Sequence, residues 1–285
     1  MKYRHSFHAG NFADVHKHLT LLALLGALKR KEKGFLYFDG HAGRGRYDLP
    51  GGAAEAAAGV GRFLAREHRA PELRHYAHLL GELRAARGSA HFYPGSPLLA
   101  LKELRREDRA VFVECQGGEA SALAQAVAEA RGSAPRAAQP KVRIERGDGL
   151  ALMKAALPPP ERRALLLLDP PYEEPRGEFA RAAAAVADGL RRFATGVYVL
   201  WYPIKEQRAA ESWRAGWMEA IAAPTLASEL WLYPRDSRVA LNGSGLLIAN
   251  PPYQIEARMR AWLPELAAAL GAGNSGGTEV RILSQ

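Results

Sequence analysis

The stretch Leu165-Leu-Leu-Leu-Asp169-Pro170-Pro171-Tyr172 decides how the rest of the chain is interpreted. A run of four leucines is typical of a strand that is buried on both faces of a parallel sheet. The prolines cannot donate to the ladder, so the strand ends there. Asp169 therefore stands at the carboxyl end of a strand, which is where ligands bind in open α/β sheets. An acid, two rigid prolines and an aromatic ring on one turn suit a flat base that carries an exocyclic amine.

Composition limits the possible classes of protein. The chain has 285 residues, 48% of them hydrophobic, which is enough for one large α/β domain with an insertion. The single cysteine, Cys115, excludes an internal disulfide and favours a reducing compartment, so we expect a cytoplasmic protein. No signal peptide or membrane-spanning run is present in the sequence, so we expect no membrane association. The net charge of +9 favours a nucleic acid partner, although an arginine-rich coding bias alone produces the same charge.

Strand and helix patterns alternate along the chain, which predicts a doubly wound sheet. A helix capped by Asp14 is expected to end near Arg30. Residues 53–87 are rich in Ala, Leu and Arg at a helical spacing that Pro71 breaks, and they predict a helical insertion. We therefore divide the chain into an arm, first helix and first strand (1–50), an insertion (51–92) and the rest of the core (93–285). The seven strands are predicted at 35–38, 109–114, 141–145, 163–168, 196–201, 226–233 and 245–248.

Acids close three successive strands before the Asp169 strand. Asp39 opens a glycine-rich turn after the first strand, Glu114 ends the second, and Asp148 follows the third. A carboxylate at the position of Glu114 can accept both hydroxyl hydrogens of a ribose, and Asp148 can accept from an adenine amino group. Each acid alone has an equally good explanation as a solvated charge. Together they indicate a site for an adenosine-type cofactor, followed by a reaction site at Asp169.

The turn at Asp169 suggests a specific chemistry. An exocyclic adenine amine is a poor nucleophile because its lone pair is delocalised into the ring. If Asp169 and the rigid backbone carbonyl of Pro170 each accept one N–H bond, the lone pair is freed for attack on a sulfonium methyl group. Tyr172 can stack on the base, which must first be turned out of its helix. The alternative is an ordinary Pro-Pro turn after a core strand.

A second motif competes with the first. Asn250-Pro-Pro-Tyr253 also follows an apolar strand, and its amide oxygen can accept from an amine just as well. The reaction strand should follow closely after the cofactor-binding strands, as the Asp169 strand does. Asn250 comes two strand–helix units later, so we interpret it as a structural end of a strand.

The amino-terminal stretch from Tyr3 to His18 interleaves aromatic, basic and histidine residues, as in segments that bind bases and phosphates. Lys17 and His18 fall near the positive end of the first helix, which favours an anion such as the methionyl carboxylate of a cofactor. The histidines lack the partners of a metal site, so we expect no metal. An ordered terminal arm without function remains the alternative. The insertion arginines, from Arg62 to Arg87, are interpreted as a solvated helical face or as a phosphate-binding one.

With these residues in hand, the chain resembles the bacterial 23S ribosomal RNA adenine-N6 methyltransferases over nearly its whole length. The specific matches are Tyr3-Arg-His-Ser-Phe-His-Ala-Gly-Asn with Asp14 and Lys17, His41-Ala-Gly with Gly45-Arg-Tyr47, Tyr93-Pro-Gly-Ser-Pro97, Asp169-Pro-Pro-Tyr172, Phe193-Ala-Thr-Gly196 and Trp201-Tyr-Pro203. The chain departs from the pattern at Gly40 and Arg44 and most of all in the insertion, so the resemblance supports no RNA contact there.

The resemblance implies a Rossmann-like class I methyltransferase fold: a mostly parallel seven-stranded sheet with helices on both faces and a small helical insertion. It implies S-adenosylmethionine as donor, S-adenosylhomocysteine as product, 23S rRNA as partner, and a monomer. Asp169, with Pro170 and Tyr172, would be catalytic, and Tyr3 and His5 would meet the RNA. The cofactor contacts that it implies are Lys17, His18, His41, Ser96, Glu114, Asp148, Gly149 and Asp169.

Two other functions are weighed against rRNA methylation. A DNA adenine-N6 methyltransferase shares the catalytic turn but usually carries a target-recognition domain, for which this chain has no room. A non-catalytic RNA-binding α/β protein does not explain the acids at the strand ends. The sequence leaves open which adenine is modified and whether free rRNA or an assembly intermediate is the substrate.

Overall fold

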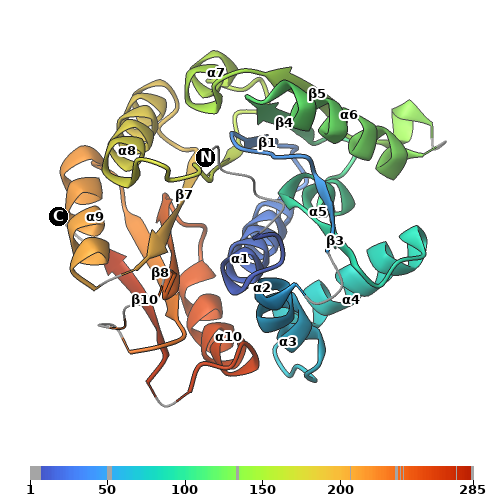
Figure 1. Ribbon diagram of the computed structural model, residues 1–285. Coiled ribbons are helices and arrows are strands. Elements are labelled where there is room, and N and C mark those ends of the chain that lie inside the picture. The colour runs from blue at the N-terminus through green and yellow to red at the C-terminus, as the bar shows by residue number, and fades with distance from the viewer. Residues whose placement is uncertain are drawn as a thin grey trace.

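An eight-stranded sheet runs through the centre of the molecule in the computed structural model (Figure 1). The structure describes residues 8–49, 53–132, 135–205, 207–234, 237, 239, 241–273 and 275–283. The strands of the sheet are β1 (Leu36–Asp39), β4 (Arg109–Glu114), β5 (Lys141–Arg146), β6 (Ala164–Leu168), β7 (Val197–Ile204), β8 (Thr225–Trp231), β9 (Gly243–Ala249) and β10 (Gly277–Leu283). Their spatial order is β10-β8-β9-β7-β6-β1-β4-β5.

The leucine run forms the centre of this sheet, as predicted. All five residues of β6 are buried, and the strand pairs in parallel with β1 on one side and β7 on the other. β4 and β5 extend the parallel part beyond β1. β9 is antiparallel to both β7 and β8, and β10 is antiparallel to β8. The carboxyl ends of β1, β4, β5 and β6 therefore meet at one edge of the sheet.

The prediction of seven strands is wrong, because β10 adds an eighth at the edge next to β8. Its residues pair with the whole length of β8, from Gly277 opposite Trp231 to Leu283 opposite Thr225. Only Val280 is buried in this strand, and Ile282 is 43% exposed. A strand with so little buried surface, following directly on a glycine-rich segment, has a weak hydrophobic pattern.

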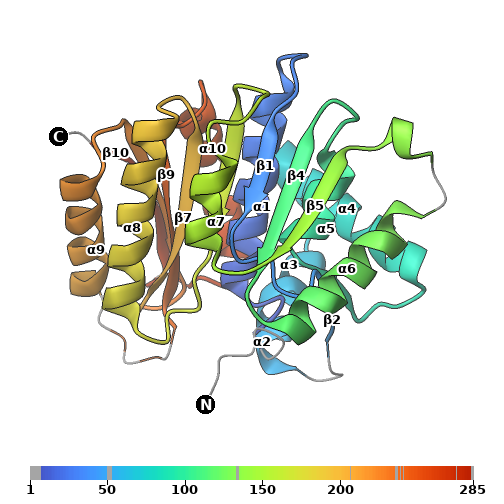
Figure 2. The ribbon, with the colours of Figure 1, turned by 90° about the horizontal axis from the view of Figure 1, so that it is seen from above.

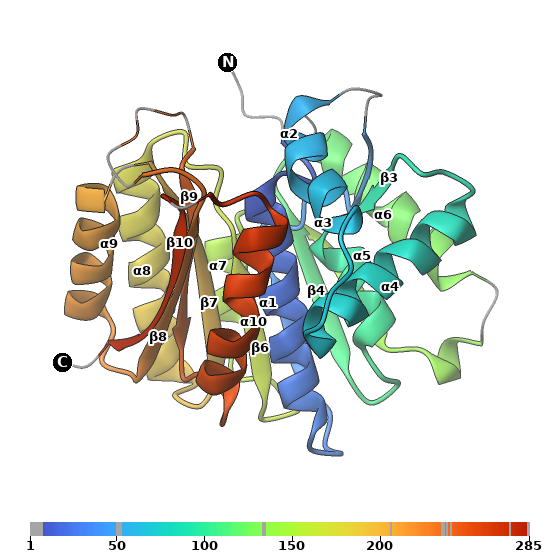
Figure 3. The same cartoon turned by 90° about the horizontal axis from the view of Figure 1, so that it is seen from below.

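Helices cover both faces of the sheet. One face carries α1 (Phe12–Lys29), α5 (Ser96–Glu103), α6 (Gly117–Arg131) and α10 (Ile255–Ala269), and the other carries α7 (Gly149–Ala156), α8 (Pro175–Arg192) and α9 (Gln207–Ala220). Figure 2 shows α7 to α9 in front of the sheet, and Figure 3 shows α1 and α10 in front of it from the opposite side. A short 3-10 turn, η3 (Arg136–Ala138), precedes β5. Among the described residues, no helix is both long and apolar enough to cross a membrane.

Helix α1 starts two residues before the predicted cap. The Asn11 side chain accepts from the backbone N–H of Asp14 at 3.0 Å, and the Asp14 carboxylate accepts from the backbone N–H of Gly10 at 2.9 Å. Asn11 is therefore the cap of the helix, and Asp14, in its first turn, binds the backbone of the residue before the cap. The helix is buried on nearly all sides. His16, fully buried, bonds Ser244 at 3.0 Å through Nδ1 and Ser228 at 3.1 Å through Nε2, which ties α1 to β9 and β8.

The segment predicted as an insertion is helical. It contains α2 (Ala54–Ala56), the π-turn η2 (Ala57–Gly61), α3 (Arg62–Leu64) and α4 (Pro71–Arg87). Pro71 does not break a helix but starts α4, since proline fits the first turn. Two short strands flank the insertion and pair with each other antiparallel, β2 (Arg46–Asp48) and β3 (Phe92–Pro94). This ribbon joins the insertion to the turn that follows β1.

Candidate active site

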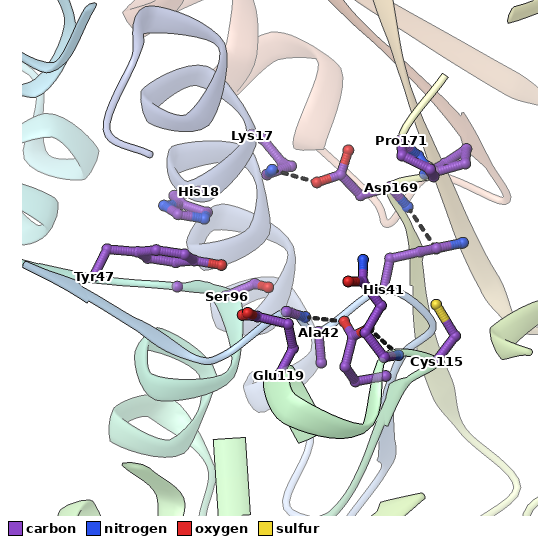
Figure 4. Close-up of a pocket in the computed structure, with 15 residues that line it drawn as sticks. Lys17, His18, His41, Ala42, Tyr47, Ser96, Cys115, Glu119, Asp169 and Pro171 are labelled. Carbon is purple, nitrogen blue, oxygen red and sulfur yellow. Dashed lines mark hydrogen bonds and ion pairs between the residues drawn. The ribbon is translucent and has the colours of Figure 1, made fainter. Parts of the chain in front are cut away.

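A pocket opens at the edge where the parallel strands end, between α1 and the ends of β1, β4 and β6 (Figure 4). Of the predicted site residues, it brings together Lys17, His18, His41, Ser96, Glu114, Asp169 and Pro170. Its other lining residues are Ala42, Gly43, Tyr47, Gly95, Cys115, Gln116, Glu119 and Pro171. Residues as far apart in the sequence as Lys17 and Asp169, which are 152 positions apart, thus line one hollow, as expected when parallel strands end together.

Lys17 and Asp169 form an ion pair at one wall of the pocket, where Figure 4 shows them pointing toward one another. Lys17 Nζ also donates to Asp14 at 2.8 Å. Burial of the ammonium opposes its charge, but the two carboxylates outweigh this and raise the pKa of Lys17 well above its ordinary value. The Nζ atom further lies 5.9 Å from the centre of the Trp201 ring. Lys17 is therefore a fixed positive charge beside Asp169.

His41 and Asp39 hold the backbone of the pocket in place. The ring Nδ1 of His41 accepts from the backbone N–H of Asp169 at 3.1 Å, which requires a neutral ring. Burial lowers the pKa of His41 to about 4, in keeping with this role. Asp39 is fully buried and accepts from the Ser96 hydroxyl at 2.6 Å and from the Tyr37 hydroxyl at 3.0 Å. Burial raises the pKa of Asp39 to about 6, although these hydrogen bonds act in the opposite direction.

Glu114 stands at the end of β4 with its carboxylate fixed by the backbone. One oxygen accepts from the N–H of Gly43 at 3.0 Å and the other from the N–H of Gln116 at 2.8 Å. Each carboxylate oxygen can accept more than one hydrogen bond. Glu114 can therefore accept two further hydrogen bonds from a ligand in the pocket while it keeps those from Gly43 and Gln116.

His18 lies on the side of the pocket formed by α1 and the insertion. Its Nδ1 is 2.9 Å from the Tyr93 hydroxyl and 3.4 Å from that of Tyr76, and its ring is stacked on Tyr93 with 5.6 Å between centroids. The ring is almost fully buried. These contacts fix the orientation of the imidazole one residue after Lys17.

Asp148 and Gly149 lie next to the pocket rather than in its lining. Asp148 Oδ1 caps α7 by accepting from the backbone N–H of Leu150 at 2.8 Å, and Oδ2 pairs with Arg181 at 3.0 Å. A Cβ atom at Gly149 would stand 1.9 Å from the carbonyl oxygen of Gly40. Only glycine permits this close approach, so the start of α7 rests directly on the turn after β1.

Tyr172 is turned away from the pocket. It adopts a φ of 57°, its ring is 8% exposed, and its hydroxyl donates to the Trp201 carbonyl at 2.5 Å. The ring is stacked on Trp213 of α9, with 5.2 Å between centroids and an interplanar angle of 19°. In this structure Tyr172 packs against Trp213 and does not line the pocket.

Asn250 lies at the opposite edge of the sheet, since β9 runs antiparallel to β7. Its side chain donates to the carbonyls of Ala194 at 2.7 Å and Gly196 at 2.8 Å. It is therefore a structural end of a strand, as interpreted from the sequence.

Tyr3 and His5 lie outside the described residues. Within the described ranges, no group of three or more His, Cys, Asp or Glu is placed to hold a metal ion.

Comparison with known proteins identifies the family. The family model described as ribosomal RNA large subunit methyltransferase D, RlmJ, matches residues 32–283. The chain belongs to this family. Its relatives in Haemophilus influenzae and Escherichia coli K12, both named ribosomal RNA large subunit methyltransferase J, are each 34% identical. The first match covers 100% of this chain and 99% of the relative, and the second covers 97% and 96%.

A crystal structure supports the same conclusion for the fold of this RlmJ family member. Protein LPL1258 from Legionella pneumophila is 32% identical and superposes with a TM-score of 0.85 over 98% of this chain and 99% of that one. The predicted class I methyltransferase fold and the family resemblance are confirmed, with eight strands in place of seven. As a member of the RlmJ family, the protein is a ribosomal RNA methyltransferase.

Some residues of the site in this RlmJ family member were missed from the sequence. Asp14 was interpreted as a helix cap, but it also forms an ion pair with Lys17, which pairs with Asp169 as well. Glu119 lines the pocket and pairs with Arg44 through two hydrogen bonds of 2.8 and 3.1 Å. The spacing of Asp14 and Lys17, three apart on one helix, signals their pairing. No local pattern signals the pairing of Arg44 with Glu119, which are 75 positions apart.

Proposed function

We propose that this protein methylates the exocyclic N6 of a single adenine in 23S rRNA, with S-adenosylmethionine as donor. The observation that carries the proposal is the Lys17–Asp169 pair on the wall of a pocket that also holds Glu114. An acid followed by Pro-Pro stands where a base amine can be bound, beside acceptors that suit a nucleoside. The names of the curated relatives favour rRNA of the large subunit as the substrate.

The residues of the pocket fit S-adenosylmethionine. Glu114 has spare acceptor capacity for two ribose hydroxyls, and Lys17 with His18 supplies the cationic and polar end that suits a carboxylate. Ser96, at the first turn of α5, and His41 lie between them in the lining. We propose Asp148 as acceptor for the adenine amine, in addition to its role as cap of α7. Gly149 would contribute only its backbone, because the contact with Gly40 excludes a side chain.

The chemistry of transfer is assigned to the turn after β6. S-adenosylmethionine supplies, when bound, an electrophilic methyl group. Asp169 and the backbone carbonyl of Pro170 each accept one N–H of the adenine amine, which directs its lone pair. Lys17 holds the side chain of Asp169 in position at the pocket through their ion pair. The proton lost from the amine passes to Asp169 or to water. Stacking of Tyr172 on the base requires its ring to leave Trp213.

The finer assignments follow from the same proposal. Tyr3 and His5 are proposed to contact the RNA, and the segments 1–50, 51–92 and 93–285 are proposed as arm with first strand, insertion and remaining core. We propose that the protein acts in the cytoplasm as a monomer, with no metal.

The test is methyl transfer from labelled S-adenosylmethionine to unmodified 23S rRNA, to assembled large subunits and to DNA. We expect label in 23S rRNA, at one adenine when the product is digested and mapped. Label in DNA alone would overturn the proposal in favour of a DNA methyltransferase. Tight RNA binding without label in any substrate would favour a non-catalytic RNA-binding protein.

A further inference from the structure

A second hollow lies beyond Tyr172 along the chain. Its lining comes from the start of α8, the end of β7 and the first half of α9, and consists of Glu174, Pro175, Arg176, Gly177, Pro203, Lys205, Ala209 and Trp213. It shares no residue with the pocket described above. Its volume is about 540 Å³, within the range of roughly 300–1,000 Å³ for small-molecule sites. We call it the flanking hollow.

A series of aromatic rings connects the flanking hollow with the catalytic turn. Trp213 is stacked on Tyr172, and Tyr172 meets the edge of Trp201 at 5.6 Å. Trp201 in turn lies 5.9 Å from Lys17 Nζ, the partner of Asp169. Three successive aromatic rings and Lys17 therefore connect the flanking hollow with Asp169, where the target base is proposed to react.

The wall of the flanking hollow is flat, apolar and rigid. Trp213 is only partly buried, and its ring also contacts those of Phe179 and Tyr202, with 5.1 Å and 5.6 Å between ring centroids. Pro175 and Pro203 add two further stiff apolar surfaces. An indole held in one orientation is a platform on which any nucleobase can stack.

The rim of the flanking hollow carries two cations that have no partner among the residues that the structure describes. Arg176 and Lys205 are exposed, and neither side chain forms a hydrogen bond or ion pair within the described residues. In contrast, the other arginines of α8 are paired, Arg181 with Asp148 and both Arg191 and Arg192 with Asp188. Unpaired cations beside an aromatic platform suit a phosphate next to a stacked base. Glu174, the acid of the lining, can accept from an exocyclic base amine.

We infer that the flanking hollow binds a nucleotide adjacent to the target adenosine in the rRNA, with its base on Trp213 and its phosphate at Arg176 and Lys205. This inference rests on the proposed function. An adenosine that is turned out of its stack leaves its neighbour with an exposed face. Trp213 covers that face, so the flanking hollow contributes RNA affinity and a preference for an intact base beside the target.

The first experiment removes the two rim cations. Arg176→Ala/Lys205→Ala is compared with Lys33→Ala/Arg106→Ala, which removes two exposed, unpaired charges just before β1 and β4, at the opposite edge of the sheet. Binding of an rRNA fragment is measured against salt concentration. We expect the rim variant to bind about tenfold more weakly, with a salt slope reduced by roughly 0.7 for each lost phosphate contact. Equal behaviour of the two double variants would overturn the inference.

The second experiment tests the base. RNA fragments carry an abasic nucleotide on one or the other side of the target adenosine, and binding is measured for the wild type and for Trp213→Leu. On one side we expect the abasic substitution to weaken binding to the wild type by about tenfold. The same substitution should have no further effect in Trp213→Leu, because both changes remove one contact. Additive losses, or no loss on either side, would contradict the inference.

Binding and methylation are measured separately, so the two proposals fail separately. A wild type that binds RNA with the expected dependence on Trp213 but transfers no methyl group would refute the proposed function alone. A wild type that methylates 23S rRNA without that dependence would refute the flanking hollow alone.

Discussion

Two strands of this sheet end in nearly the same sequence, Asp169-Pro-Pro-Tyr172 after β6 and Asn250-Pro-Pro-Tyr253 after β9, yet they end at opposite edges. β6 runs parallel to β1 and β7, so Asp169 joins Glu114 in the lining of the pocket. β9 is antiparallel to β7, and its last residue, Ala249, pairs with Tyr198 near the start of that strand. Strand direction therefore decides which motif faces a ligand, and the four-residue motif alone does not.

Burial is reversed between the two motifs. Tyr172 is 8% exposed and packs on Trp213, whereas Tyr253 is 82% exposed. The carboxylate of Asp169 is a hydrogen-bond acceptor in the lining of the pocket. The side-chain amide of Asn250 instead donates to the backbone carbonyls of Ala194 and Gly196. The first motif therefore places a carboxylate in the pocket. The second binds the end of its strand to the loop that precedes β7.

The largest expected difference is in catalysis. Asp169→Ala should lower the rate of methyl transfer to 23S rRNA by about 10³-fold or more, because the acceptor for the amine is lost. Asn250→Ala should retain a rate per folded molecule within roughly twofold of the wild type. Single-turnover transfer of labelled methyl groups measures both, and calorimetry should show that Asp169→Ala still binds the cofactor. An inactive Asn250→Ala beside an active Asp169→Ala would reverse our assignment.

The next difference is in stability. Tyr172→Ala should lower the free energy of unfolding by about 3–5 kcal/mol, since a buried ring and its contact with Trp213 are removed. Tyr253→Ala should change it by no more than about 0.5 kcal/mol. Urea unfolding provides the measurement, and Tyr172→Phe is the control that removes only the hydrogen bond to Trp201, at a cost of about 1 kcal/mol. If Tyr172→Ala and Tyr253→Ala lowered the free energy of unfolding equally, the difference in burial between the two rings would not affect stability.

The third difference depends on pH. The first motif is held by His41, whose folded pKa of about 4 lies below its ordinary value of 6.5 because of burial. Above pH 6.5 the ring is neutral in both the folded and the unfolded chain. Below pH 6.5 His41 binds a proton in the unfolded chain but remains neutral in the folded chain. The free energy of unfolding therefore falls as the pH is lowered to about 4.

The loss assigned to His41 should reach up to about 1.4 kcal/mol for each pH unit in that window. Urea unfolding of the wild type and of His41→Gln between pH 7.5 and 5 measures this loss. The difference between the two proteins is due to His41, because the other groups titrate in both. The wild type should lose more stability than the variant. Asn250→Ala should show the same pH dependence as the wild type, because its motif contains no histidine or carboxylate.

The smallest expected effect concerns the backbone at Asn250, which has a φ of 54°. Asn250→Gly loses two hydrogen bonds but tolerates this φ, and Asn250→Ala loses the bonds and adds strain. We expect Asn250→Ala to be less stable than Asn250→Gly by about 1 kcal/mol in urea unfolding. Equal stability of the two would show that the turn relaxes when the amide is removed.

Much of the fold was predictable because its signals are local. β4 has the predicted bounds to the residue, and β6 is the core strand that its leucines indicate. β10 was missed because its one buried residue, Val280, gives no periodic pattern. An edge strand depends on a partner that its own sequence does not reveal.

The candidate site was predictable where it follows from topology. Glu114 and Asp169 line one pocket because parallel strands end at one edge, and Lys17 reaches it because α1 packs beside that edge. The orientation of Tyr172 was not predictable, since it depends on Trp213, 41 positions later in the chain. The cap formed by Asp148 is local, but its second partner, Arg181, comes from another helix.

The hydrogen bonds of His16 have a consequence for synthesis of the chain. Its partners Ser228 and Ser244 lie 212 and 228 residues further along, on β8 and β9. Helix α1 is among the first elements to emerge during translation, but its buried histidine has no partners until most of the chain has been made. Contacts between residues so far apart in the sequence form late in folding. Until they form, the apolar surface of α1 is exposed and can aggregate. Helix α1, which presents Lys17 to Asp169, is therefore synthesised early but acquires its buried contacts late, so we expect nascent chains to depend on chaperones.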